Sequence, residues 1–166
     1  MILADPIFYF KFVRDIPFKL PLSADEPAYS CSFKHVVLGT LLASLGLKVR
    51  FGLCRFLFND LNLPESLKKI PHIDNTPHFY LEVYNMEQAR WMIVDATWDK
   101  GLDSKLPISE WDGRSDTILA VKPIEILKPI ETPAEFDQLR PQLAQQIKIN
   151  GKFYEAFNKW VKSIRT

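Results

Sequence analysis

Three residues of the chain have side-chain types that suit nucleophilic catalysis. Cys31 would be the nucleophile, His78 the base and Asp95 the group that orients the base. Cys31 lies in the stretch YSCSFKHVVLGTLLASLG, where a helix is predicted to begin with Ser30 as its cap. Because a helix N-terminus carries partial positive charge, this position favours a thiolate.

His78 and Asp95 fall on two predicted strands, HFYLEVY (78–84) and RWMIVDATW (90–98), joined by a short polar stretch as in a hairpin. With a loop at residues 85–88, His78 and Asp95 stand directly opposite each other. Directly opposed side chains have Cβ atoms roughly 4.5–5.5 Å apart, so the carboxylate can hold the imidazole and stabilise its protonated form. A slip of one residue would send one of the two side chains to the other face.

A zinc site is the main alternative use of the thiol. His35 lies four residues after Cys31 on the same helical face, and His72 or His78 could add further ligands. No second cysteine pair or close histidine cluster completes a tetrahedral set, so we expect no metal.

Two further residues compete with the three candidates. Asp99 shares a strand face with Asp95 and could replace it, but it lies further from His78 in the proposed register. Cys54 sits in an apolar strand and is expected to be a core residue.

The composition fits one compact domain over residues 1–166, which are 47% hydrophobic and 13% aromatic. A net charge of +1 gives no strong attraction to nucleic acid or to an anionic membrane, and we expect neither as a partner. No apolar run can span a bilayer, and the first residues do not look like a signal peptide. Two cysteines make no disulfide framework, so we expect free thiols and a cytoplasmic protein.

The elements that must position these residues follow an α+β order. Apolar residues cover most of the predicted helix over 31–45, which must therefore be central. Thr132 is the expected cap of a later helix that Pro141 kinks or divides. The predicted elements are an extended lead-in over 1–30 with room for one short strand or helical turn, the helix over 31–45, strands over 48–58, 78–84 and 90–98, an edge strand over 119–127 limited by Pro123, and two helices over 132–147 and 151–165.

The residues around Cys31, His78 and Asp95 resemble the core of the transglutaminase-like superfamily, within the wider papain-like cysteine fold. The resemblance rests on a cysteine that opens a helix, LLASLGLKVR, HFYLEVY with its histidine, and RWMIVDATWD, and it covers about residues 29–99. It implies an α+β domain with a central helix that bears the cysteine, packed on an antiparallel sheet, and with C-terminal helices over about 130–166.

The resemblance also implies a reaction. Cys31 would attack an amide or ester carbonyl and form a thioester, His78 would protonate the leaving group, and Asp95 would hold His78. Water as acceptor makes a peptidase or amidase, and an amine makes a transglutaminase or acyltransferase. The expected partner is a peptide, protein or small amide substrate, without a cofactor, and the sequence leaves the oligomeric state open.

One departure from the family pattern leaves a second function class open. No glutamine precedes Cys31 and all four tryptophans follow it, so the backbone amide of Cys31 is the single assigned oxyanion donor. The alternative is a catalytically degenerate module that binds a peptide or protein partner without turnover.

Overall fold

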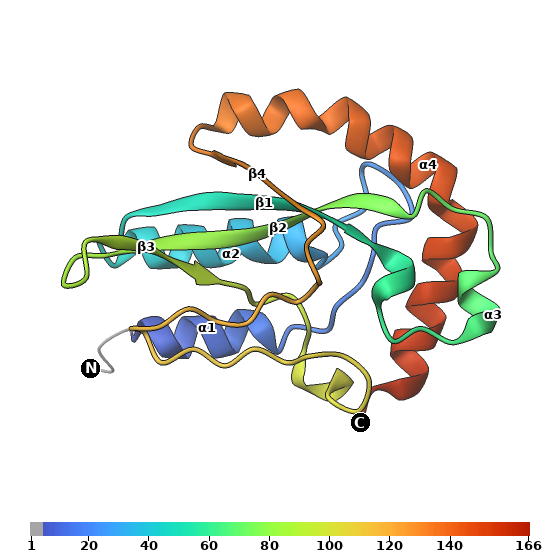
Figure 1. Cartoon of the computed structure of the whole chain (residues 1–166), viewed down its shortest axis with the longest axis horizontal. Coiled ribbons are helices and arrows are strands. Elements are labelled where there is room, and N and C mark those ends of the chain that lie inside the picture. Colours follow the sequence, from blue (N-terminus) through green and yellow to red (C-terminus); the bar gives the residue numbers. More distant parts are fainter. Residues whose placement is uncertain (1–4) are drawn as a thin grey trace.

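The computed structural model describes residues 5–166 and has an α+β architecture, as the order of elements predicts. Its four strands form one antiparallel sheet in the order β3-β2-β1-β4 (Figure 1). The elements in chain order are α1 (Pro6–Arg14), α2 (Cys31–Ser44), β1 (Val49–Leu57), the 3-10 helix η1 (Phe58–Asp60), α3 (Glu65–Lys68), β2 (Asn75–Asn85), β3 (Arg90–Val94), the 3-10 helix η2 (Lys100–Leu102), β4 (Glu125–Ile130) and α4 (Pro133–Ile164).

Helix α2 is central, which confirms the prediction from its apolar surface. It packs between α1 on one side and strands β1 and β2 on the other. Leu38 and Leu42 of α2 are fully buried. The helix ends before Gly46, whose positive φ of 82° suits a glycine. The first residue of α2 therefore stands on a rigid element.

Helix α1 occupies part of the predicted lead-in and is longer than a single helical turn. Asp5 caps it by accepting a hydrogen bond from the Ile7 N–H at 2.9 Å, and Pro6 takes the first helical position. Phe10 and Val13 are fully buried against the α2 side of the core. Phe8 and Phe12 are exposed on the opposite face of the helix, so its burial rests on Phe10 and Val13. Residues 1–4 of the lead-in lie outside the described part.

The hairpin of β2 and β3 forms as predicted, but its register differs. Asn85 pairs with Arg90 and Leu81 with Val94, so the loop is 86–89 rather than 85–88. The side chain of Asn85 accepts a hydrogen bond from the Gln88 N–H at 3.0 Å and closes the turn. The prediction of His78 directly opposite Asp95 is wrong by two residues. Because side chains alternate along a strand, a register offset of two residues keeps His78 and Asp95 on the same face of the sheet.

The C-terminal part contains one helix where two were predicted. Helix α4 runs unbroken for 32 residues, includes Pro141, and begins with the predicted capping box of Thr132 and Glu135. Gly151 does not interrupt it, because its neighbours Asn150 and Phe153 are fully buried and hold the helix against the core. Figure 1 shows that α4 bends, so that one part follows β4 and the other covers the end of the sheet.

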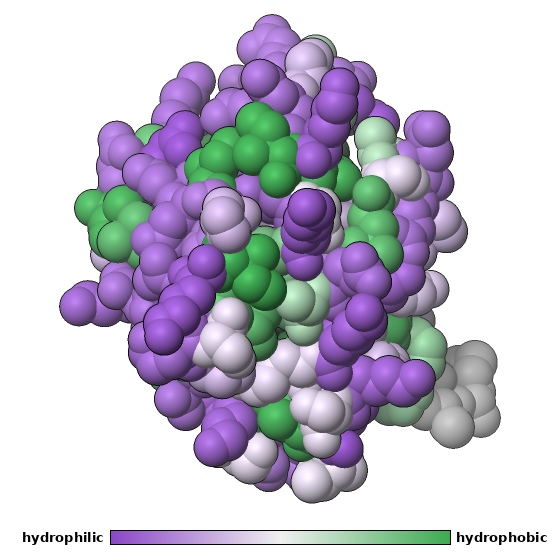
Figure 2. Space-filling view, turned by 90° about the vertical axis from the view of Figure 1, so that its right-hand side faces the viewer, coloured by the Kyte–Doolittle hydropathy of each residue, from purple (hydrophilic) through white to green (hydrophobic). Residues whose placement is uncertain are grey.

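Strand β4 is an edge strand, as predicted, but it spans Glu125–Ile130 rather than 119–127, because the strand begins only after Pro123. Figure 2 shows one face of the molecule with hydrophilic residues over most of it and hydrophobic residues in separate patches. Within residues 5–166, no helix combines the length and the apolar character needed to cross a bilayer.

Candidate active site

His78 and Asp95 form a buried pair at the end of the hairpin. His78 lies within β2 and Asp95 directly follows β3. The His78 Nε2 and the Asp95 Oδ2 are 2.8 Å apart, and the two residues are 2% and 0% exposed. Since Leu81 pairs with Val94, the two residues are diagonal rather than direct neighbours across the ladder. The structure thus contains the contact that the sequence predicts, in a different register.

Asp95 is held by donors on both carboxylate oxygens. Its Oδ1 accepts from the hydroxyl of Thr97 at 2.6 Å and from the N–H of Thr97 at 3.1 Å, and its Oδ2 also accepts from the Ala120 N–H at 2.8 Å. Burial would raise the pKa of Asp95, but the charge and hydrogen bond of His78, with His35 and the Ala120 N–H, hold it below its usual range. Asp95 is a fixed carboxylate.

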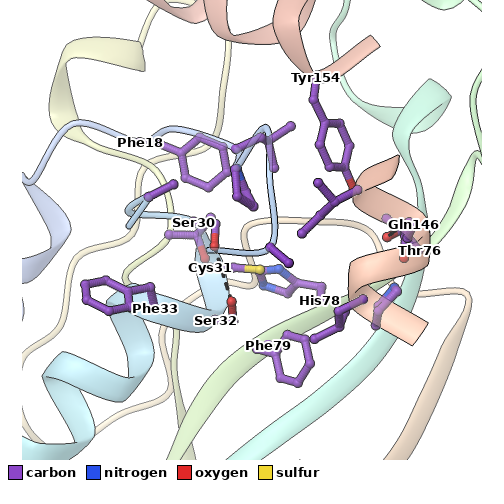
Figure 3. Close-up of a pocket in the computed structure, with 18 of the residues that line it drawn as sticks. Phe18, Ser30, Cys31, Ser32, Phe33, Thr76, His78, Phe79, Gln146 and Tyr154 are labelled. Carbon is purple, nitrogen blue, oxygen red and sulfur yellow. Dashed lines mark hydrogen bonds between the residues drawn. The ribbon is translucent and has the colours of Figure 1, made fainter. Parts of the chain in front are cut away.

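His78 is a stable imidazolium. Burial alone would lower its pKa, but the charge and hydrogen bond of Asp95, together with Cys31, raise the pKa of His78 to about 10. Because Nε2 binds Asp95, Nδ1 is the nitrogen left for Cys31. Figure 3 shows the Cys31 sulfur beside the His78 ring. The site therefore brings Cys31, His78 and Asp95 together in that order.

Cys31 is the first residue of α2, and its side chain is half-buried. Ser30 takes the cap position, but its side chain makes no capping bond and lies 3.2 Å from the Ser32 hydroxyl instead. In the described chain, the backbone N–H groups of Cys31, Ser32 and Phe33 have no hydrogen-bond acceptor. Free amides at a helix N-terminus can bind a negative charge.

His35, which the sequence offered as a zinc ligand, instead makes structural contacts. It is fully buried; its Nδ1 lies 2.7 Å from the Cys31 carbonyl oxygen, and its Nε2 accepts from the Ala96 N–H at 2.9 Å. Burial lowers the pKa of His35 to about 4, so it is neutral with the proton on Nδ1. Both nitrogens are used, and no cluster of three metal-binding side chains occurs within residues 5–166. His35 joins the start of α2 to the residue after Asp95.

Lys34 is a second residue whose role the sequence did not indicate. Its ammonium is fully buried and donates to the carbonyl oxygens of Arg14, Ile16 and Thr97 at 2.7, 3.0 and 2.8 Å. Burial lowers the pKa of Lys34 to about 7. Lys34 thus ties α2 to the end of α1 and to the segment that follows Asp95.

The two competing residues lie elsewhere. Asp99 binds the Phe18 N–H at 2.8 Å and the Arg165 guanidinium at 3.0 and 2.9 Å, so it does not orient His78. Cys54 is fully buried in β1, and burial raises the pKa of its thiol to about 12. Cys54 is a core residue, as expected.

A cavity of about 630 Å³ opens at Cys31, and we call it the Cys31 cavity. Its walls come from the segment over 18–36, from the ends of β1 and β2, and from α4. Figure 3 shows the rings of Phe18, Phe79 and Tyr154 around the thiol. The arrangement gives a small molecule or peptide a site next to a potential nucleophile.

No protein-family model, curated protein or solved structure matches the chain.

Proposed function

We propose that this protein is a transglutaminase-like cysteine enzyme that transfers acyl groups from amide or peptide bonds, with water as the main acceptor. The observation that carries the proposal is the fully buried imidazolium–carboxylate pair of His78 and Asp95, which meets a half-exposed thiol at a helix N-terminus. The resemblance to the transglutaminase-like superfamily and its papain-like fold supports it, because the same three residues carry that resemblance.

The first half of the reaction follows from the charges. The His78 imidazolium stabilises the Cys31 thiolate, whose sulfur forms a bond to the carbonyl carbon of the amide. The carbonyl electron pair moves to oxygen, and the free N–H groups at the start of α2 stabilise the resulting oxyanion. The C–N bond then breaks, and the amine leaves with the proton of His78 Nδ1. The product is a thioester on Cys31.

The second half regenerates the enzyme. Neutral His78 accepts a proton from water as the water oxygen bonds to the thioester carbon. The carbon–sulfur bond breaks, the acid departs, and Cys31 is again a thiolate beside an imidazolium. An amine in place of water gives a new amide. Asp95 keeps its charge throughout and holds Nε2, so that Nδ1 faces the sulfur.

The test is the alkylation of Cys31 by iodoacetamide at pH 6, followed by intact mass. An ordinary thiol, with a pKa of about 8.5, is almost fully protonated at this pH. We expect Cys31 to react at least about tenfold faster than a peptide thiol, and His78→Gln to remove this advantage. Cys54 should stay unlabelled until the protein is denatured, and Cys54→Ala is the matched control.

A Cys31 rate equal to that of a peptide thiol would overturn the proposal and favour the peptide-binding module. If Cys31 is reactive, incubation with a peptide amide, with and without an added amine, identifies the acceptor from the mass of the product.

A further inference from the structure

The walls of the Cys31 cavity differ from its rim in charge. Most of the wall is hydrophobic, and the charged residues among its lining are Asp25, Glu26, Arg140 and, beside Cys31, the His78 imidazolium, which is already paired with Asp95. Asp25 and Arg140 are exposed at the rim. Glu26 is paired with Lys19. Apart from His78, the inner wall is formed by uncharged side chains, chiefly Phe18, Phe56, Phe58, Trp98, Val121 and Ile147.

Away from His78, the polar side chains Thr76, Gln146 and Tyr154 of the inner wall are neutral. Gln146 donates from its side-chain amide to the Thr76 hydroxyl, and both residues are buried. Burial raises the pKa of Tyr154 to about 12, so its hydroxyl is neutral as well. In Figure 3, Gln146 and Thr76 lie together at one side of the cavity. This polar corner offers dipoles but no countercharge.

Helix α4 contributes apolar side chains to the same hydrophobic cluster that Cys31 packs against. Leu143 and Phe136 pack in the same hydrophobic cluster as Cys31, around Phe79 of β2. Leu143 also lines the cavity and is half-buried. A group attached to the carbonyl that Cys31 attacks would therefore contact hydrocarbon on several sides.

From this arrangement we infer that the acyl donor presents an uncharged, apolar side chain, aromatic or branched aliphatic, to the Cys31 cavity. The inference rests on the proposed function and adds its substrate class. An ionised side chain would lose its water in the cavity, where the His78 imidazolium is already paired with Asp95, so it would gain no unpaired partner of opposite charge, which is costly. An apolar side chain would gain from leaving water. A volume of about 630 Å³ lies within the range of ligand cavities, roughly 300–1,000 Å³.

The test uses four acetyl-amino-acid chloromethyl ketones that differ in side chain: phenylalanine, leucine, glutamate and lysine. Each alkylates a thiolate with loss of chloride, and iodoacetamide gives the intrinsic reactivity of Cys31. We expect the phenylalanine and leucine probes to label Cys31 at least about tenfold faster than the glutamate and lysine probes. Intact mass and peptide mapping measure the labelling.

A positive charge placed on the cavity wall should change the order of the labelling rates of the four probes. Leu143→Lys should slow the phenylalanine probe and raise the rate of the glutamate probe relative to it. Gln142→Lys, which adds the same charge at an exposed neighbouring position of α4, should leave the order unchanged. The melting temperatures of both variants show whether they fold.

The outcomes separate the two proposals. Equal rates for all four probes on a Cys31 that reacts rapidly with iodoacetamide would overturn the substrate class and leave the proposed function standing. A Cys31 that reacts with iodoacetamide no faster than a peptide thiol would overturn both. The labelling rates of the four probes on the unmodified protein test the substrate class even if Leu143→Lys does not fold.

Discussion

At the scale of residues, the site depends on a carboxylate that is already saturated with donors. Asp95 accepts hydrogen bonds on both oxygens and has no contact with water. A carboxylate in this state cannot move or take up a proton without losing several bonds. His78 therefore keeps one orientation, and its charge is the property that depends on pH.

The pair makes stability depend on pH in a defined direction. His78, whose pKa rises on folding, stabilises the protein below pH 6.5, and this stabilisation is lost as the pH rises from 6.5 to about 10. Asp95, whose pKa falls on folding, stabilises the protein above pH 3.8, and this stabilisation is lost as the pH falls below that value. The His78–Asp95 pair therefore contributes most to the stability of the protein between pH 3.8 and pH 6.5.

We expect Asp95→Asn to lower the free energy of unfolding by about 3 kcal/mol near pH 6, because the buried His78 would lose the carboxylate that stabilises its charge. The variant should also lose the decline in stability between pH 6.5 and 10. Urea unfolding from pH 4 to 10 measures both effects. Asp103→Asn, at an exposed position, is the control. An unchanged alkaline slope in Asp95→Asn would contradict the assignment.

At the scale of elements, β1 and β2 fit together through a missing side chain. Gly52 pairs with Tyr80, and a Cβ at Gly52 would collide with the Tyr80 ring. Tyr80 is 2% exposed and stacks on His78 with ring centroids 6.2 Å apart. The glycine thus allows the tyrosine to pack over β1 while supporting the histidine.

Gly52→Ala should lower the free energy of unfolding by about 1–3 kcal/mol, since the Tyr80 ring must move in a packed core. Gly151→Ala is the matched contrast, because its Cβ would meet nothing within 4 Å in α4 and a helical alanine is favoured by up to about 1 kcal/mol. Urea midpoints measure both changes. A Gly52→Ala variant with an unchanged free energy of unfolding would show that the Tyr80 ring is free to move.

At the scale of the whole molecule, hydrogen bonds join the C-terminal end of α4 to the segment that leads into α2. Arg165 donates to both oxygens of Asp99 and to the Phe18 carbonyl oxygen, and the Phe18 N–H donates to Asp99. Phe18 belongs to the cavity wall. Arg165, directly after α4, therefore helps to hold a cavity wall that lies far away in sequence.

Arg165→Met should lower the free energy of unfolding by about 1–2 kcal/mol through the loss of these charged hydrogen bonds. Hydrogen exchange of the Phe18 amide should become faster, because its acceptor loses its countercharge. Lys162→Met, at an exposed position near the same helix end, is the control. Equal exchange in the two variants would show that Arg165 does not fasten the segment.

Hydrophobic patterns predicted the sheet strands and the central helix because both are set by local periodicity. The contact of His78 with Asp95 was also predictable, since a change of loop position by one residue offsets the register by two and preserves the face. The partners of His35 and Lys34 could not be predicted. They are backbone groups of Ala96, Arg14, Ile16 and Thr97, which approach through packing and carry no sequence signal.

The position of α4 in the sequence has a consequence for biosynthesis. Every other part of the Cys31 cavity, including Cys31 and His78, precedes α4 in the chain, and so does Asp95. A growing polypeptide emerges with its N-terminal side first. The thiol and the apolar wall are therefore open to the surroundings until α4 has emerged and docked. Helix α4, which is translated after the nucleophile, is the element that encloses it.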